Sequence, residues 1–119
     1  MATTSIVKIV SYVLLISFLE TAGQGAIKYA HDYNNPSIGV LGPIMYAFIC
    51  VILYQLYKSQ GMALINGWWN IMTSITVTLS GVLIFGEVLK HSDYLGLAMI
   101  IVGAGFLNID NLMSIKTLI

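Results

Sequence analysis

Four apolar segments, each long enough to cross a lipid bilayer, dominate this sequence. They cover residues 6–29, 38–57, 62–85 and 94–113. Crossing a hydrocarbon core of ~30 Å takes about 20 helical residues, whereas the strands of a membrane barrel are about 10 residues long and alternate in polarity. The segments therefore predict transmembrane helices. The composition agrees, because 58% of the residues are hydrophobic and only 8% are charged, against about 25% charged residues in soluble domains.

Short polar connections separate the four segments. Residues 31–37 contain an Asn-Pro step that ends a helix, residues 58–61 form a tight turn, and residues 86–93 form a third loop. Helices joined so closely must be antiparallel neighbours. We therefore expect one domain over residues 1–119, an all-α membrane protein with four helices in a compact up-down bundle.

The lysines carry little information about orientation. In a chain with four spans, Lys8, Lys58 and Lys116 fall on one side of the membrane, and Lys28 and Lys90 fall on the other. The lysine and arginine bias sets the orientation of membrane proteins, and a split of three to two barely favours either direction. We expect an integral multi-pass protein that inserts in both orientations, in the plasma (inner) membrane if the chain is prokaryotic.

One carboxylate, Glu20, lies in the middle of the first apolar segment. A charge near the centre of a bilayer costs on the order of 3 kcal/mol even on the lenient insertion scale, so such residues usually serve transport or pairing. Helical spacing places Ser17, Gly23 and Gln24 on the same stripe as Glu20, and Gly23 lets another helix or a ligand approach. The alternative for Glu20 is a structural ion pair with Lys28, which lies two turns along the same helix.

Polar stripes also occur in the next two segments. In the third segment one stripe at helical spacing is nearly all polar or aromatic, and it consists of Asn66, Trp69, Asn70, Thr73, Val77 and Ser80. Tyr46 lies on a comparable face of the second segment. Lipid-facing positions should be apolar, so we expect these stripes to face protein or a water-filled cavity. For Asn66 and Asn70 the alternative of simply bridging two helices stays open.

The fourth segment differs, because small residues among aliphatic ones are its main feature. Gly96 and Gly103 lie seven residues apart and therefore share one face of a helix. Small residues at helical spacing let membrane helices pack closely, so we expect this segment to be an association surface. A single four-helix bundle leaves little room for a ligand, whereas two copies can enclose a chamber between them.

Nothing in the sequence indicates an enzyme or a cofactor. The single cysteine, Cys50, excludes an intramolecular disulfide and a cysteine-based metal cluster. His31 and His91 lack metal-ligand spacing, and the loops hold no combination of nucleophile and base. Five lysines balance five acids, and they form no basic run. We therefore expect no enzymatic activity, no cofactor, no metal and no nucleic-acid partner.

Taken together, these residues resemble the small multidrug resistance (SMR) transporters of the drug/metabolite transporter superfamily. Members of that family are four-helix proteins of about this length that work as antiparallel dimers. The residues that carry the resemblance are Glu20, Gly23, Lys28, Tyr46, Trp69, Gly96, Gly103 and Asn108. Asn66 stands where the family usually has a tyrosine, and Asn70 stands where it usually has a small serine.

The resemblance implies a proton-coupled antiporter that exports small organic cations such as quaternary ammonium or guanidinium compounds. The side chains that would bind protons or substrate are Glu20, Tyr46, Asn66, Trp69 and Asn70. Those that would support them are Ser17, Gln24 and Thr73, and those that would pack helices or the dimer are Gly23, Gly96 and Gly103. The implied partners are a second copy of the chain in an antiparallel homodimer, the cation, protons and the bilayer.

Two other functions stay open. Relatives of the family include flippases for lipid-linked or polyamine substrates, some of which work as one half of a heterodimer. Such a chain would be inactive alone in liposomes. A non-transporting accessory subunit, with Glu20 paired to a basic residue of a partner, would show no proton-coupled flux and would be recovered with a larger complex.

Overall fold

The computed structural model describes the backbone of residues 2–107 and the side chains of residues 7–106. Within that range all the regular structure is helical. The helices are α1 (Ala2–Asp32), α2 (Pro36–Gly39), α3 (Leu41–Leu56), α4 (Met62–Leu83) and α5 (His91–Leu107). The prediction of an all-α bundle of four long helices is confirmed.

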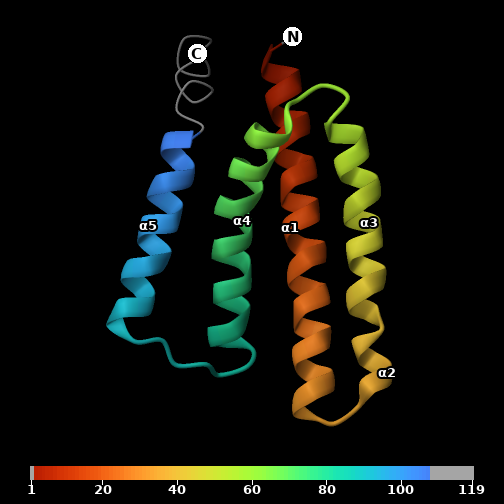
Figure 1. The fold of residues 1–119 in the computed structure, drawn as a ribbon, viewed down its shortest axis with the longest axis vertical. Coiled ribbons are helices and arrows are strands. Elements are labelled where there is room, and N and C mark those ends of the chain that lie inside the picture. The colour runs from red at the N-terminus through yellow and green to blue at the C-terminus, as the bar shows by residue number, and fades with distance from the viewer. Residues whose placement is uncertain (1, 108–119) are drawn as a thin grey trace.

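Helix α1 forms the centre of the bundle. Helix α3 packs against one side of α1 and α4 packs against another, while α5 packs against α4 (Figure 1). The short helix α2 also contacts α1 and leads directly into α3. Because successive long helices run in opposite directions, the C-terminal end of α1 lies at the same end of the bundle as the α4–α5 connection (Figure 1).

Helix α1 ends three residues later than the predicted position 29. Its end is a Schellman motif, in which a residue in the left-handed region closes the helix. Asn34 has a φ of 53°, its N–H donates to the His31 carbonyl at 3.3 Å, and the Asn35 N–H donates to the Ala30 carbonyl at 2.9 Å. These bonds satisfy carbonyls at the helix end that would otherwise lack a partner.

Helix α4 begins at Met62 as predicted, whereas the other described boundaries differ from the predictions. Helix α1 begins at Ala2 rather than at residue 6, and the second predicted helix is divided at Val40. Helix α5 begins at His91 rather than at residue 94. At this start of the helix, the Asp93 carboxylate accepts a hydrogen bond from the Lys90 N–H at 2.9 Å. The predicted end of the last helix, at residue 113, lies outside the described residues.

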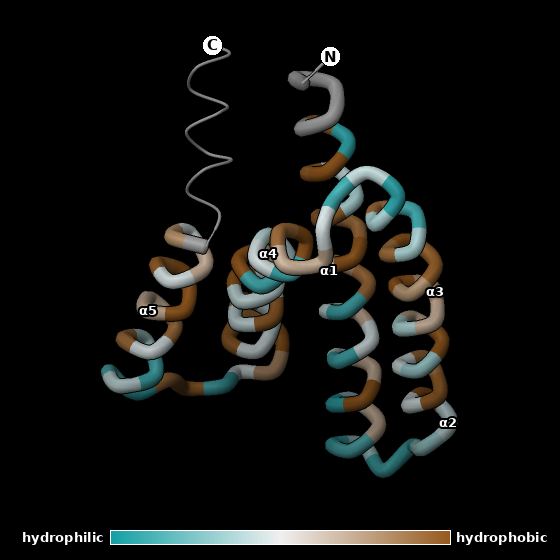
Figure 2. Tube along the Cα trace, turned by 45° about the horizontal axis from the view of Figure 1, so that its top comes forward, coloured by the Kyte–Doolittle hydropathy of each residue, from teal (hydrophilic) through white to brown (hydrophobic). Residues whose placement is uncertain are grey.

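In the described part of the chain, two helical segments are long and apolar enough to cross a membrane, Val7–Asp32 and Pro36–Leu56. The asparagine, threonine and serine side chains of α4 lower its hydropathy, and Figure 2 shows hydrophilic positions interspersed along it. Helix α5 is described over 17 residues. The two segments support a membrane location, while four spans stay a prediction.

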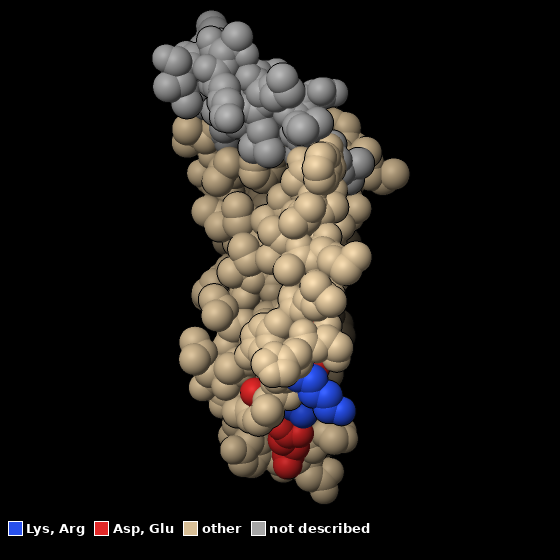
Figure 3. All heavy atoms as spheres, turned by 90° about the vertical axis from the view of Figure 1, so that its left-hand side faces the viewer, with Lys and Arg blue, Asp and Glu red and all other residues tan. Residues whose placement is uncertain are grey.

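Among residues 7–106, the charged side chains lie near the ends of the bundle, with one exception. Lys8 and Lys58 mark one end, and Lys28, Asp32, Glu87, Lys90 and Asp93 mark the other. Figure 3 shows one face of the molecule, on which the charged atoms gather near the latter end and the described surface above them carries none. The exception is Glu20, which lies between the two ends along α1.

A small apolar core holds α1, α3 and α4 together. Its fully or nearly fully buried members are Ile9, Val13, Ile16, Ile49, Leu56 and Ile65. Many other large apolar side chains are exposed in the single chain, among them Phe18, Phe48 and Phe106. Large exposed apolar surfaces mark membrane or protein interaction sites, so most of the outer surface of this chain suits lipid or another polypeptide.

Helices α1 and α3 approach each other closely at two glycines. A Cβ atom on Gly42 would lie 2.6 Å from Ile27 Cδ1, and one on Gly23 would lie 3.2 Å from Met45 Cβ. A side chain at Gly42 would force Ile27 to shift, and one at Gly23 would contact Met45 more tightly than is usual. Gly23 therefore serves the packing of α1 against α3 within one chain.

Candidate functional site

The Glu20 side chain lies between α1, α3 and α4, where neutral side chains donate to its carboxylate. Thr73 Oγ1 of α4 donates to Oε2 at 2.9 Å. Tyr46 Oη of α3 donates to Oε1 at 3.3 Å, and Gln24 Nε2 of α1 donates to the same oxygen at 3.2 Å. One residue from each of the three packed helices therefore contacts the carboxylate.

Further hydroxyl groups extend this network along the interface between α1 and α4. Ser17 Oγ lies 3.4 Å from Thr73 Oγ1, and the Ser17 residue has no exposed surface. Thr21 Oγ1 lies 2.7 Å from the Ser17 carbonyl oxygen and 2.8 Å from Thr76 Oγ1. The two helices are thus joined by a row of hydrogen bonds whose members are Ser17, Glu20, Thr21, Thr73 and Thr76.

Thr21 and Thr76 are the members of the network that the sequence analysis missed. Their positions in the sequence could have predicted this membership, because Thr21 lies four residues after Ser17 and Thr76 lies three residues after Thr73. Residues at these spacings share one face of a helix. The structure shows that the two faces meet.

No cationic side chain contacts Glu20 within residues 7–106. The Lys28 ammonium lies 3.4 Å from Asp32 Oδ1, one turn further along α1. In the structure, Lys28 therefore forms its ion pair with Asp32 and not with Glu20. A carboxylate that is held by neutral donors keeps its capacity to bind a proton or a cation from outside the chain.

Three of the candidate residues on α4 do not join this network. Trp69 packs against the apolar core, and its buried Nε1 has no acceptor among the described residues. Asn66 and Asn70 are exposed, and their side chains make no hydrogen bond in the described part of the chain. The structure thus brings Ser17, Glu20, Gln24, Tyr46 and Thr73 together and leaves Asn66, Trp69 and Asn70 apart from them.

The glycines of α5 face open space in the single chain. A Cβ atom on Gly96 or Gly103 would meet nothing within 4 Å. Neither glycine is therefore needed for packing against the described residues. Asn108, the other fourth-helix residue of the resemblance, lies outside the described residues.

Comparison with known proteins adds no family assignment. The chain matches no family model, no curated protein and no solved structure. The resemblance to the small multidrug resistance transporters therefore rests on the sequence residues named above and stays a prediction.

Proposed function

We propose that this protein is a proton-coupled antiporter that exports small organic cations across a membrane. The observation that carries the proposal is the environment of Glu20, a carboxylate midway along an apolar helix whose hydrogen-bond donors among residues 7–106 are all neutral. Such a group can hold either a proton or a cation, and each ligand displaces the other. Competition for one carboxylate couples the two fluxes without a cofactor.

The neighbours of Glu20 suit this role. The donors on Thr73, Tyr46 and Gln24 stabilise the ionised form of the carboxylate, because hydrogen bonds to a charged group contribute about 1.5–3 kcal/mol each. Tyr46 is 36% exposed, so its ring is accessible to a ligand. An aromatic face contributes up to about 2 kcal/mol to binding a desolvated cation.

We propose further that the working unit is an antiparallel homodimer with four spans per copy. Helix α5 supports this, because it is apolar all round, packs against α4 and presents Gly96 and Gly103 to open space. A glycine face allows two membrane helices to approach closely. Two inverted copies would reproduce the inverted repeat with which larger transporters alternate access. Asn66 and Asn70 would then face the chamber between the copies.

The proposal is tested by measuring proton-coupled currents from purified protein in liposomes on a solid-supported membrane. The substrates are guanidinium, tetramethylammonium and spermidine. Glu20→Gln should abolish the currents, because the amide keeps the shape of the side chain but binds neither a proton nor a cation. Glu20→Asp should retain transport with a changed pH profile, because it keeps the carboxylate and moves it by one methylene group.

Asp93→Asn is the matched control, because it also neutralises a carboxylate. Asp93 lies at the start of α5, and asparagine keeps an oxygen that can accept the Lys90 N–H. This control should transport at the wild-type rate. Undiminished transport by Glu20→Gln would refute the proposal. Flux that requires a second, different subunit would favour a heterodimeric flippase, and absence of flux with recovery in a larger complex would favour an accessory subunit.

A further inference from the structure

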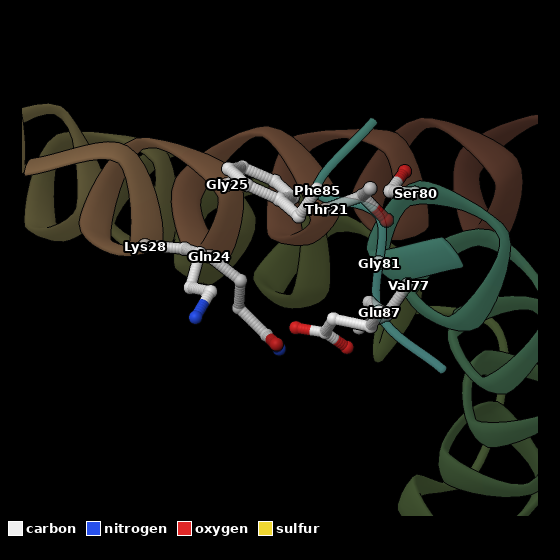
Figure 4. Close-up of a pocket in the computed structure, with 9 residues that line it drawn as sticks. All are labelled: Thr21, Gln24, Gly25, Lys28, Val77, Ser80, Gly81, Phe85 and Glu87. Carbon is white, nitrogen blue, oxygen red and sulfur yellow. The ribbon is translucent and has the colours of Figure 1, made fainter. Parts of the chain in front are cut away.

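A groove of about 170 Å³ lies beside the Glu20 network, between α1 and the C-terminal end of α4. The residues that matter for its chemistry are Gln24 and Lys28 of α1, Gly81 of α4, and Phe85 and Glu87 of the connection to α5 (Figure 4). Gln24 belongs to both sites, because it lines the groove and its Nε2 lies 3.2 Å from Glu20 Oε1. The groove therefore adjoins the half-buried Glu20 carboxylate.

The backbone after α4 holds Glu87 over this groove. Gly86 has a φ of 66°, a conformation that favours glycine, and it turns the chain back towards the helix. The Glu87 N–H then donates to the Gly81 carbonyl at 3.0 Å. A Cβ atom on Gly81 would lie 2.7 Å from Glu87 Oε2, so the absence of a side chain at Gly81 provides the space that the carboxylate occupies.

The charge on Glu87 has no counter-charge in the described part of the chain. Lys28, the lysine that lines the groove, is paired with Asp32 at 3.4 Å. Figure 4 shows the Glu87 carboxylate and the Gln24 amide extending towards the same space. The Phe85 ring forms another part of the wall, and its Cε2 atom would lie 3.9 Å from a Cβ on Gly25.

We propose that Glu87 and Phe85 form an outer binding site for a small organic cation, from which the cation reaches Glu20 past Gln24. A carboxylate and an aromatic ring that line the same groove attract such a cation by charge and by the cation–π interaction. The cation class rests on the proposed function. A negative group at the mouth of a site also raises the local concentration of a cation, an effect that falls with ionic strength.

The test measures binding rather than transport, and it uses the full-length Glu20→Gln protein so that the inner site is removed. Tetramethylammonium chloride is titrated into this protein in bicelles. NMR follows the side-chain amide of Gln24 and the backbone amides of residues 85–87. We expect saturable shifts. Equal shifts with sodium chloride at the same ionic strength would overturn the proposal.

Three variants in the Glu20→Gln background locate the site. Glu87→Gln should weaken binding on the order of tenfold, the size expected for loss of one charge contact at a partly exposed position. Gly81→Ala should weaken it several-fold, because the added methyl group displaces the Glu87 carboxylate without removing its charge. Gly105→Ala, in α5, is the matched control, because a Cβ there would meet nothing within 4 Å, and it should leave binding unchanged.

Lys28→Gln completes the set. It should strengthen tetramethylammonium binding, because it removes a positive charge from the groove. Weaker tetramethylammonium binding by Lys28→Gln would show that the groove does not select cations and would overturn the proposal. Equal affinity of the proteins with and without the Glu87 carboxylate would also overturn it. Neither result would bear on whether Glu20→Gln abolishes transport, so the outer site and the proposed function can fail separately.

Discussion

The Thr73 hydroxyl group of α4 lies 2.9 Å from Glu20 Oε2 of α1. The other carboxylate oxygen, Oε1, is approached by Gln24 of α1 and Tyr46 of α3 at 3.2 and 3.3 Å. The two oxygens therefore have their donors on different helices. A displacement of α4 relative to α1 would change the hydrogen bonding of Oε2 alone. In the proposed transport cycle, the position of α4 would thereby affect how strongly the carboxylate binds a proton or a cation.

Removing the Thr73 hydroxyl should slow transport. Valine has nearly the shape of threonine without the donor, and a hydrogen bond to a charged group contributes about 1.5–3 kcal/mol. We expect Thr73→Val to lower the initial rate of proton-driven uptake into liposomes by on the order of tenfold, and Thr73→Ser to retain most of the rate. The control is Thr78→Val, because the Thr78 hydroxyl has no hydrogen-bond partner among the described residues. Equal losses in both valine variants would contradict the role of Thr73.

Filling the contact between α1 and α3 should destabilise the single chain. A methyl group on Gly42 would lie 2.6 Å from Ile27 Cδ1, and overpacking of this kind costs about 1–3 kcal/mol. We expect Gly42→Ala to lower the free energy of unfolding by that amount in a denaturant titration of the protein in mixed micelles. Gly105→Ala, on α5 with open space around it, should be neutral or slightly stabilising. A Gly42→Ala protein as stable as the wild type would show that the two helices are further apart than the structure has them.

A large side chain on the glycine face of α5 should separate two copies without unfolding either one. A Cβ on Gly103 would meet nothing within 4 Å in the single chain, so Gly103→Leu should leave the thermal stability of the monomer unchanged. We expect it to raise the dimer dissociation constant in detergent, measured by sedimentation or energy transfer, on the order of tenfold. Ala98→Leu, on a different face of the same helix, is the matched control. Equal weakening by both variants would contradict an interface at the Gly103 face.

The two exposed asparagines of α4 should affect substrate choice and not stability. Asn66 and Asn70 make no hydrogen bond within the described residues, and surface changes of this kind stay within about 0.5 kcal/mol. We expect the double variant Asn66→Ala/Asn70→Ala to unfold like the wild type. Its affinity for guanidinium should fall several-fold, because guanidinium has N–H groups that an amide oxygen accepts. Tetramethylammonium has none, so its affinity should stay constant, and an equal fall for both cations would contradict this role.

Much of the helical architecture follows from local pattern. The apolar segments predicted the four long helices, and the polar loops predicted where α1, α3 and α4 end, to within a few residues. The errors arose where the end of a helix depends on backbone geometry. Asn34 enters the left-handed region at the end of α1, and hydropathy does not distinguish that residue from its polar neighbours.

For the site, the sequence predicted which residues share a face of one helix, but not which faces of different helices meet. Helical spacing placed Ser17 and Gln24 beside Glu20, because that relationship lies within one helix. Spacing could not say how α4 is rotated against α1. That rotation brought Thr73 and Thr76 to the interface and left Asn66 and Asn70 outside it.

The sequence by itself determined that this chain forms apolar helices and carries one carboxylate midway along the first of them, because both properties depend on residues that are close along the chain. Tertiary structure decided which groups of α3 and α4 surround that carboxylate. It also decided that Glu87 lies over Gly81. These contacts depend on the packing of helices and on the turn at Gly86, whose geometry is set by the whole bundle and not by neighbouring residues.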